Sequence, residues 1–104
     1  MAYEARYVLR PNPGADLGAV IEALKAGAAL WKKHGAPAAR LWGVASGELG
    51  NYVLTIEFEN AMEYAKVTDP LSADPEFRRW QASNVQSGAF TWVRSNLMRE
   101  ISLS

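Results

Sequence analysis

Residues 51–59 read Asn51-Tyr52-Val53-Leu54-Thr55-Ile56-Glu57-Phe58-Glu59 and carry the strongest β-strand pattern in the chain. Aromatic and branched residues stand at every second position from Tyr52 to Phe58, so they would share one face of a sheet. The opposite face would carry Val53 and Thr55, whereas a face exposed to water usually carries strongly polar residues. We therefore expect this strand to lie in a sheet whose two faces are both covered.

Three further strands are predicted around this one. Residues 40–46 precede it across a four-residue turn at 47–50, so the two strands form a hairpin. Residues 3–10 are rich in aromatic and branched side chains and stop at Pro11-Asn12-Pro13-Gly14. Residues 90–101 read as a long last strand, with a bulge as one reading. Simple alternation divides the apolar residues of this strand into Phe90, Trp92 and Met98 on one face and Val93 and Leu97 on the other.

The first helix is predicted between the first two strands. Apolar residues recur every three or four positions from Leu17 to Trp31, directly after the N-cap candidate Asp16. The last turn carries Lys32, Lys33 and His34, whose positive charge would favour the negative end of the helix dipole. Because His34 is the only histidine of the chain, a triad or a multi-histidine metal centre is excluded within one chain, and we expect a capping role.

The second helical region is predicted between the hairpin and the last strand. Asn60 and Glu63 have the spacing of a capping box. The helix is expected to pause near Asp69-Pro70 and to restart at Asp74-Pro75, where a cap residue precedes a proline. Gly88 is the expected stop. A role in a turn or as a helix cap explains both Asp69 and Asp74, so no metal site is expected there.

The resulting order is strand, helix, strand, strand, helix, strand over residues 1–104, read as a single domain. This order predicts the α+β class and a ferredoxin-like βαββαβ fold, a four-stranded antiparallel sheet in the order 4-1-3-2 with the helices on one face. About five apolar side chains would then lie on the uncovered face, worth roughly 8 to 15 kcal/mol if buried. Since that rivals the net stability of a domain, about 5 to 15 kcal/mol, we expect a homodimer with the sheets face to face, a dimeric α/β barrel.

Composition excludes several classes of protein. Eleven basic residues balance eleven acidic ones, so no overall field would attract nucleic acid or an anionic membrane. The absence of cysteine excludes disulfides and thiolate metal sites and fits a cytoplasmic location. No run of about 18 apolar residues and no leader pattern occurs, so neither membrane spanning nor secretion is expected. No cofactor motif is present, and none is expected to be bound.

Three short segments resemble the dimeric α/β barrel superfamily, which includes NIPSNAP-like proteins, antibiotic-biosynthesis monooxygenases and stress-responsive barrel proteins. They are Tyr7-Val8-Leu9-Arg10-Pro11, Leu54-Thr55-Ile56-Glu57-Phe58 and Ala73-Asp74-Pro75-Glu76-Phe77. The resemblance implies a cavity between sheet and helices that binds a small apolar or aromatic molecule. It also implies that some members oxidise such a molecule without a cofactor. Haem degradation is disfavoured, because Glu57 stands where that branch has tryptophan and the second helix contains no histidine.

The candidate site residues are aromatic side chains and the polar side chains within the predicted strands. Ligand-binding candidates are Tyr7, Trp42, Trp80, Trp92 and Arg94, with plain core packing as the alternative for the tryptophans. Trp31, at the end of the apolar stripe of the first helix, is assigned to the core. The three strand charges Arg6, Glu57 and Arg94 could meet as a buried ion cluster or grip a ligand carboxylate.

Three functions compete at this point. The leading one is a small-molecule-binding protein, with cofactor-independent monooxygenase or isomerase activity on an aromatic or polyketide-like compound. The alternative is a non-catalytic homodimeric scaffold or partner-binding module whose core is full. An RNA-recognition module has the same element order but displays aromatic and basic residues on its open face, and residues 51–58 lack its basic-glycine-aromatic opening.

Overall fold

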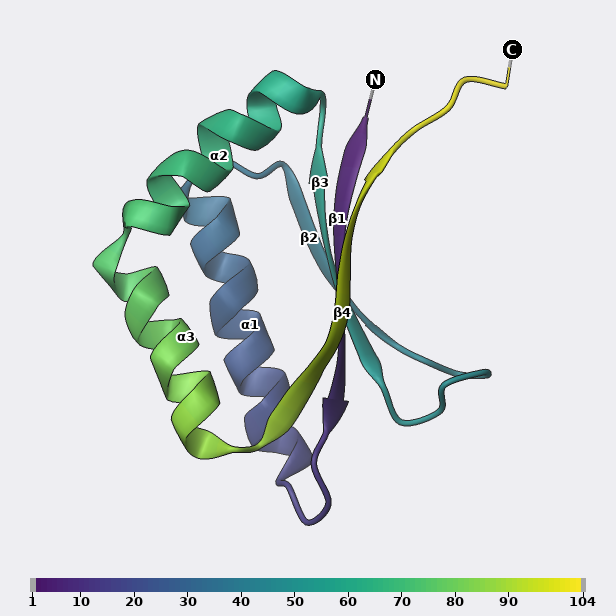
Figure 1. The fold of residues 1–104 in the computed structure, drawn as a ribbon, viewed down its shortest axis with the longest axis vertical. Coiled ribbons are helices and arrows are strands. Elements are labelled where there is room, and N and C mark those ends of the chain that lie inside the picture. The colour runs from purple at the N-terminus through teal and green to yellow at the C-terminus, as the bar shows by residue number, and fades with distance from the viewer. Residues whose placement is uncertain (1, 104) are drawn as a thin grey trace.

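The computed structural model describes residues 2–103, which form one antiparallel sheet with helices on one side (Figure 1). In chain order the elements are β1 (Tyr3–Pro11), α1 (Leu17–Lys33), β2 (Ala38–Gly43), β3 (Tyr52–Phe58), α2 (Ala61–Ala73), α3 (Pro75–Ser87) and β4 (Phe90–Arg99). The strand order is β2-β3-β1-β4, and all three pairings are antiparallel. The predicted α+β class, the ferredoxin-like topology and the 4-1-3-2 order are therefore confirmed.

Helix α1 begins and ends as its sequence predicts. The Asp16 carboxylate accepts a hydrogen bond from the Ala19 backbone N–H at 3.3 Å, which confirms it as the N-cap. The buried stripe of the helix consists of Val20, Leu24, Gly27, Leu30 and Trp31. This stripe turns α1 toward the sheet, where it contacts β2 and β3.

The second helical region divides at Asp74, so the expected pause at Asp69-Pro70 is wrong. Helix α2 runs through Pro70 to Ala73. Pro70 and Lys66 are both exposed, so the Lys66 carbonyl that Pro70 leaves without a backbone donor lies at the solvent side of the helix. The break comes at Asp74 because Pro75 disfavours the helical conformation in the residue before it. Asp74 is extended and caps α3, and Gly88 ends α3 in the left-handed conformation, as predicted.

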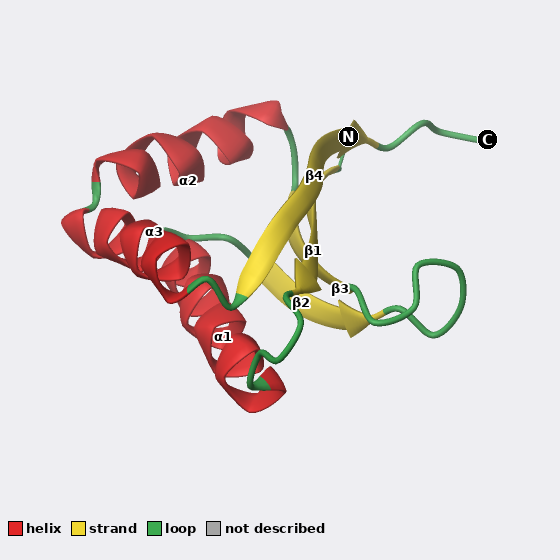
Figure 2. Ribbon diagram, turned by 60° about the horizontal axis from the view of Figure 1, so that its bottom comes forward, coloured by secondary structure: helices red, strands yellow, loops and turns green. Residues whose placement is uncertain are grey.

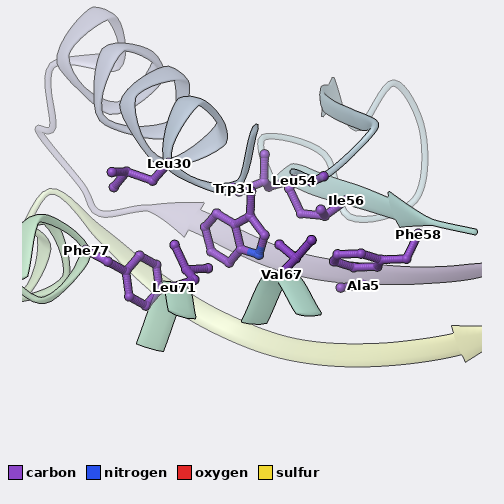
Figure 3. Close-up of a cluster of buried hydrophobic side chains, with 10 residues drawn as sticks. Ala5, Leu30, Trp31, Leu54, Ile56, Phe58, Val67, Leu71 and Phe77 are labelled. Carbon is purple, nitrogen blue, oxygen red and sulfur yellow. The ribbon is translucent and has the colours of Figure 1, made fainter. Parts of the chain in front are cut away.

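The core lies between β3 and the helices. Leu54, Ile56 and Phe58 are fully buried and pack against residues of all three helices, among them Trp31, Val67 and Leu71 (Figure 3). The sequence predicted that these residues share one face of β3, and the structure shows that this face lies toward the helices. A second cluster, Leu9, Val20, Leu24 and Phe90, fills the space near the start of α1.

Strand β4 contains the bulge that the sequence left open. Its register against β1 shifts between Val8, which pairs with Arg94, and Leu9, which pairs with Trp92. Val93 is therefore the extra residue, and the side-chain alternation changes after it. Trp92 and Leu97 lie on the helix side of the sheet with their partners Leu9 and Ala5, whereas Met98 lies on the open side. The expected division of β4 by simple alternation is wrong beyond the bulge.

Candidate functional site

An aromatic hollow lies between the sheet, α1 and α3. Its volume is about 210 Å³, and its lining consists of Tyr7, Trp31, Phe77, Trp80, Gln81, Asn84, Val85 and Trp92. These side chains come from β1, α1, α3 and β4. In Figure 2 the helices α1 and α3 lie together on one side of the sheet, and the residues that line the hollow come from these helices and from the sheet. We call this set of residues the aromatic hollow.

The rings around the aromatic hollow contact one another in tilted and edge-to-face geometries. Ring centroids are 5.6 Å apart for Tyr7 and Trp31, 6.2 Å for Tyr7 and Trp92, and 6.4 Å for Trp80 and Trp92. Aromatic pairs prefer such arrangements at about 4.5 to 7 Å. Mutual packing therefore holds the walls in place, and each ring still presents part of its surface to the hollow.

Trp80 is held on α1 by two features. Its indole N–H donates to the Ala23 backbone carbonyl at 2.8 Å. Gly27 allows the close approach, since a Cβ at this position would overlap the six-membered ring of Trp80. A glycine in the middle of a helix is otherwise unfavourable by about 1 kcal/mol. Gly27 therefore determines where the Trp80 ring lies as a wall of the aromatic hollow.

Tyr7 is the titratable group of the aromatic hollow. Burial raises the pKa of its phenol above the ordinary value, and the neighbouring Tyr64 adds to the shift. Tyr7 is therefore protonated at neutral pH, and its hydroxyl has a proton to donate. None of the described lining residues is a carboxylate or an imidazole. The hollow is therefore better suited to binding a ligand and polarising one of its oxygens than to removing a proton from it.

Among the predicted ligand-binding candidates, the structure brings Tyr7, Trp80 and Trp92 together but not Trp42. Alternation along β2 places Leu41 toward the helices and Trp42 on the open side of the sheet. There Trp42 is 51% exposed and donates to the Thr55 hydroxyl at 2.8 Å. The assignment of Trp42 to the cavity wall is therefore corrected.

Arg94 lines a second hollow, of about 220 Å³, which shares Tyr7 and Trp92 with the aromatic hollow. Its guanidinium pairs with the Glu48 carboxylate at 3.1 Å. It is therefore adjacent to the predicted site and does not wall the aromatic hollow itself.

The predicted ion cluster of Arg6, Glu57 and Arg94 is not formed. Arg6 pairs with Glu4 at 2.9 Å and Glu57 pairs with Arg40 at 2.8 Å, while Arg94 uses Glu48. These side chains are about half exposed on the uncovered face, where the same strand, a neighbouring strand and the β2–β3 loop supply the partners of Arg6, Glu57 and Arg94 in turn. The expectation assumed burial, and the single chain does not bury them.

His34 forms a contact that the sequence did not reveal. It is the C-cap residue of α1, as expected, and its Nε2 lies 2.8 Å from the Asp74 carboxylate. Lys33 also donates to Asp74, at 3.0 Å, and only 9% of the Asp74 side chain is exposed. These donors, His34 first, hold the pKa of Asp74 well below its ordinary value. The cluster ties the end of α1 to the junction of α2 and α3.

Four wall residues were not predicted: Phe77, Gln81, Asn84 and Val85. The signal was present, because Phe77, Trp80, Gln81 and Asn84 follow three- and four-residue spacing along one face of a helix. Trp31 was predicted as core, which its burial confirms, but it also lines the hollow.

Other sites are weaker. A larger depression, about 780 Å³, is an open groove at the end of the sheet with charged residues such as Glu4, Arg6 and Glu57 in its lining. Such a groove would bury little of a small molecule. Within residues 2–103, no group of three or more carboxylates and imidazoles is placed to hold a metal ion. No helix in that part of the chain is long and apolar enough to cross a membrane.

Residues 3–104 match the NIPSNAP family model. The chain belongs to the NIPSNAP family. No curated protein matches this NIPSNAP protein. A solved NIPSNAP family protein of unknown function from Agrobacterium tumefaciens is 20% identical, with a TM-score of 0.73 over 100% of this chain and 91% of that one.

Two further solved structures share the fold of this NIPSNAP protein. An uncharacterised NIPSNAP-like domain protein from Burkholderia xenovorans is 17% identical, with a TM-score of 0.72 over 99% of this chain and 88% of that one. A variant of SnoaB, a cofactor-independent oxygenase from Streptomyces nogalater, is 12% identical, with a TM-score of 0.73 over 98% and 96% of the two chains. At these identities the likeness establishes the fold alone, which is the predicted superfamily fold.

Proposed function

We propose that this NIPSNAP protein binds a small aromatic or apolar molecule in the aromatic hollow. The observation that carries the proposal is the hollow itself, in which apolar ring surfaces surround three polar side chains, those of Tyr7, Gln81 and Asn84. Ligand sites are typically concave and mostly apolar with a few polar groups that orient the ligand. The rings would supply contact area, and the Tyr7 hydroxyl would donate to an oxygen of the ligand.

We also propose that the functional unit is a homodimer. Strand β4 exposes apolar side chains on both faces, among them Trp92, Val93, Leu97 and Met98, and Trp42 adds to the open side of the sheet. The radius of gyration is 14.2 Å, against about 13 Å for a compact chain of this length. The accessible surface is 6529 Å², against about 5,800 Å² for a compact monomer of this mass. A second copy would cover this excess apolar surface.

Cofactor-independent monooxygenase or isomerase activity on an aromatic or polyketide-like compound is the chemical form of this proposal. Its support is the fold shared with a cofactor-independent oxygenase, together with the protonated Tyr7 in the aromatic hollow. Tyr7 would stabilise negative charge that develops on a substrate oxygen. Incubation with hydroxylated aromatic compounds, followed by oxygen uptake and product analysis, tests the activity. A Tyr7→Phe variant should lose at least tenfold in rate if the hydroxyl has this role.

Binding is tested with toluene by ligand-observed NMR on the full chain. Trp92→Ala should weaken binding by about tenfold or more, because it removes one wall of the hollow. Trp42→Ala is the matched control, since it is the same substitution on the opposite side of the sheet. Both variants are compared at a concentration where light scattering gives the same assembly. Absent binding to the unmodified protein would overturn the proposal.

A non-catalytic scaffold or partner-binding module is the second candidate function. It is favoured by the volume of the hollow, about 210 Å³, which is below the roughly 300 Å³ at which typical ligand sites begin. Under this reading the aromatic side chains only pack, and neither toluene nor a larger aromatic compound binds.

We also propose a cytoplasmic location, supported by the absence of cysteine. Fractionation of cells that express the tagged protein tests this location.

A further inference from the structure

A second hollow lies beside the aromatic hollow, and the two share two rings. The second hollow has a volume of about 220 Å³ and is lined by Tyr7, Trp92, Val93, Arg94 and Ser95. Tyr7 and Trp92 also line the aromatic hollow, whose other walls come from the helices α1 and α3. The rings of Tyr7 and Trp92 therefore stand at the boundary between the two hollows.

The bulge of β4 leaves room for the second hollow. On the helix side of the sheet, Trp92 pairs with Leu9, and the next residue on that side is Ser95, which pairs with Tyr7. Side chains on one face of a regular strand are two residues apart, but the extra residue Val93 lengthens this step to three residues. Because the step ends on a small serine side chain, β4 itself does not fill the space beside the Trp92 ring.

Trp92 is the outer of the two boundary rings. Tyr7 is on the inner strand β1 and packs against the buried Trp31, with ring centroids 5.6 Å apart. Trp92 is on the edge strand β4 and is 42% exposed. Phe90 and Trp80 hold it edge-on, at centroid distances of 5.2 and 6.4 Å. Truncation of Trp92 would therefore remove a ring from the boundary and leave the buried core in place.

The two volumes limit the size of a ligand while the Trp92 ring is present. A dry cavity of about 150 Å³ accommodates benzene, so two linked rings need about 300 Å³. Each hollow alone is smaller than this, at about 210 and 220 Å³, whereas the two hollows together are larger. A single ring with a short substituent therefore fits the aromatic hollow, but a two-ring compound fits only if the two hollows are joined.

We infer that Trp92 is a partition between the two hollows and that it restricts the ligand of the aromatic hollow to a single-ring aromatic compound. This inference rests on the proposed function and adds the size class of its ligand. Trp92 is then a specificity-determining residue as well as a wall. Its ring supplies contact area to a small ligand, and the same ring excludes a larger ligand by overlap.

The test compares p-cresol with 4-phenylphenol, which has the same hydroxyl group but a phenyl group in place of the methyl group. Dissociation constants are measured by ligand-observed NMR for the unmodified protein and for Trp92→Ala. The unmodified protein should bind p-cresol about tenfold more tightly than 4-phenylphenol, because the second ring would overlap Trp92. In Trp92→Ala this preference should reverse, since p-cresol loses a wall and 4-phenylphenol gains the second hollow.

Two further variants locate the effect. Trp42→Ala is the matched control, because it removes the same ring from the opposite side of the sheet and should keep the preference for p-cresol. Trp92→Ala combined with Ser95→Phe fills the second hollow again with an aromatic side chain, so this double variant should lose the gain for 4-phenylphenol. All variants are compared at a concentration where light scattering gives the same assembly. If Trp92→Ala does not fold, Trp92→Leu takes its place.

The outcomes separate the two proposals. Binding of p-cresol with no gain for 4-phenylphenol in Trp92→Ala would overturn the partition and leave the proposed function standing, and this is also the result expected if a second copy of the chain fills the second hollow. Equal or tighter binding of 4-phenylphenol to the unmodified protein would likewise overturn the partition, as would a gain that persists after Ser95→Phe is added. Binding of neither compound to either protein would overturn the proposed function and, with it, the partition.

Discussion

Strands β3 and β4 have similar apolar patterns, yet their apolar side chains are buried to different extents. In β3, Leu54, Ile56 and Phe58 are fully buried beneath the helices. In β4, Trp92 is 42% exposed and Leu97 is 47% exposed, although both lie on the same side of the sheet as the β3 core residues. The difference is one of position: β3 is an inner strand that α1 and α2 contact, whereas β4 is the edge strand beside β1.

A local apolar pattern predicts a strand but not what covers it. Nine of the ten residues of β4 are exposed, four of them large and apolar, and such an edge strand would pair or aggregate in solution unless something protects it. The helices of the same chain contact β4 at Phe90 and at Trp92, yet every residue from 91 to 99 is exposed. We therefore expect a second copy of the chain to cover β4, whereas β3 is covered by helices of its own chain.

The largest expected effect comes from truncating β3. Ile56→Ala should lower the free energy of unfolding by about 2 to 5 kcal/mol, because it leaves a cavity at a fully buried position. Leu97→Ala, on the same side of the sheet in β4, should cost less than about 1 kcal/mol in the dissociated chain. Urea unfolding at low protein concentration measures both. Equal costs would contradict the distinction between the two strands.

A charge on β4 should act on assembly. Leu97→Lys should weaken the dimer by about tenfold to hundredfold, since it buries an unpaired ammonium in the interface. Leu17→Lys is the control, because Leu17 is similarly exposed, at 51% against 47% for Leu97, but lies at the start of α1. Sedimentation equilibrium measures the dissociation constants. Loss of assembly in both variants alike would show that the effect is not specific to β4.

A smaller effect is expected where α1 and α3 meet. Gly27→Ala should force Trp80 out of place and cost about 0 to 2 kcal/mol net, since a clash of about 1 to 3 kcal/mol is offset by a gain of about 1 kcal/mol in helix propensity. Toluene binding should fall with it, because Trp80 walls the hollow. Gly18→Ala, also in α1, meets only the Asp16 carboxylate and should keep binding intact. Unchanged binding in Gly27→Ala would argue against a rigid Trp80 wall.

The smallest expected effect is pH-dependent and lies at the helix junction. The pKa of Asp74 is lower in the folded chain than in the unfolded chain, where it lies near 4. The ion pairs of Asp74 therefore contribute fully to the free energy of unfolding above about pH 4, and this contribution is lost as the pH falls toward the folded-state pKa. Asp74→Asn keeps a capping side chain but removes the charge. Its stability should therefore decline less steeply below pH 4 than that of the unmodified protein.

Denaturant unfolding between pH 2 and pH 6 makes this comparison. Asp69→Asn is the control, since Asp69 is exposed within α2 and should leave the slope unchanged. An Asp74→Asn variant with the same acid dependence as the unmodified protein would contradict the ion-pair assignment.

The sequence predicted the features that local chemistry controls. Strand β3 follows from alternation, and the helix starts follow from caps such as Asp16 and Asn60, whose side chains accept from the first turns. The break at Asp74 was predicted, but Pro70 was given too much weight, because the cost of proline depends on whether the freed carbonyl meets solvent. Such exposure is a tertiary property.

The candidate site was predicted only in part for the same reason. Tyr7, Trp80 and Trp92 were expected to meet and do so. Trp42 was misplaced because the sequence gives the alternation of β2 but not which set faces the helices. Asn84 was missed because an amide on a helix is ordinary in sequence, and only its burial and its unpaired nitrogen make it notable.

The most direct test of the division between β3 and β4 is the mass of the unmodified protein in dilute solution. Multi-angle light scattering at micromolar concentration should give twice the 11.4 kDa of one chain, and amide exchange should be slow in β4 as well as in β3. A monodisperse species of 11.4 kDa with a stable fold would contradict this division, because β4 would then remain uncovered without consequence.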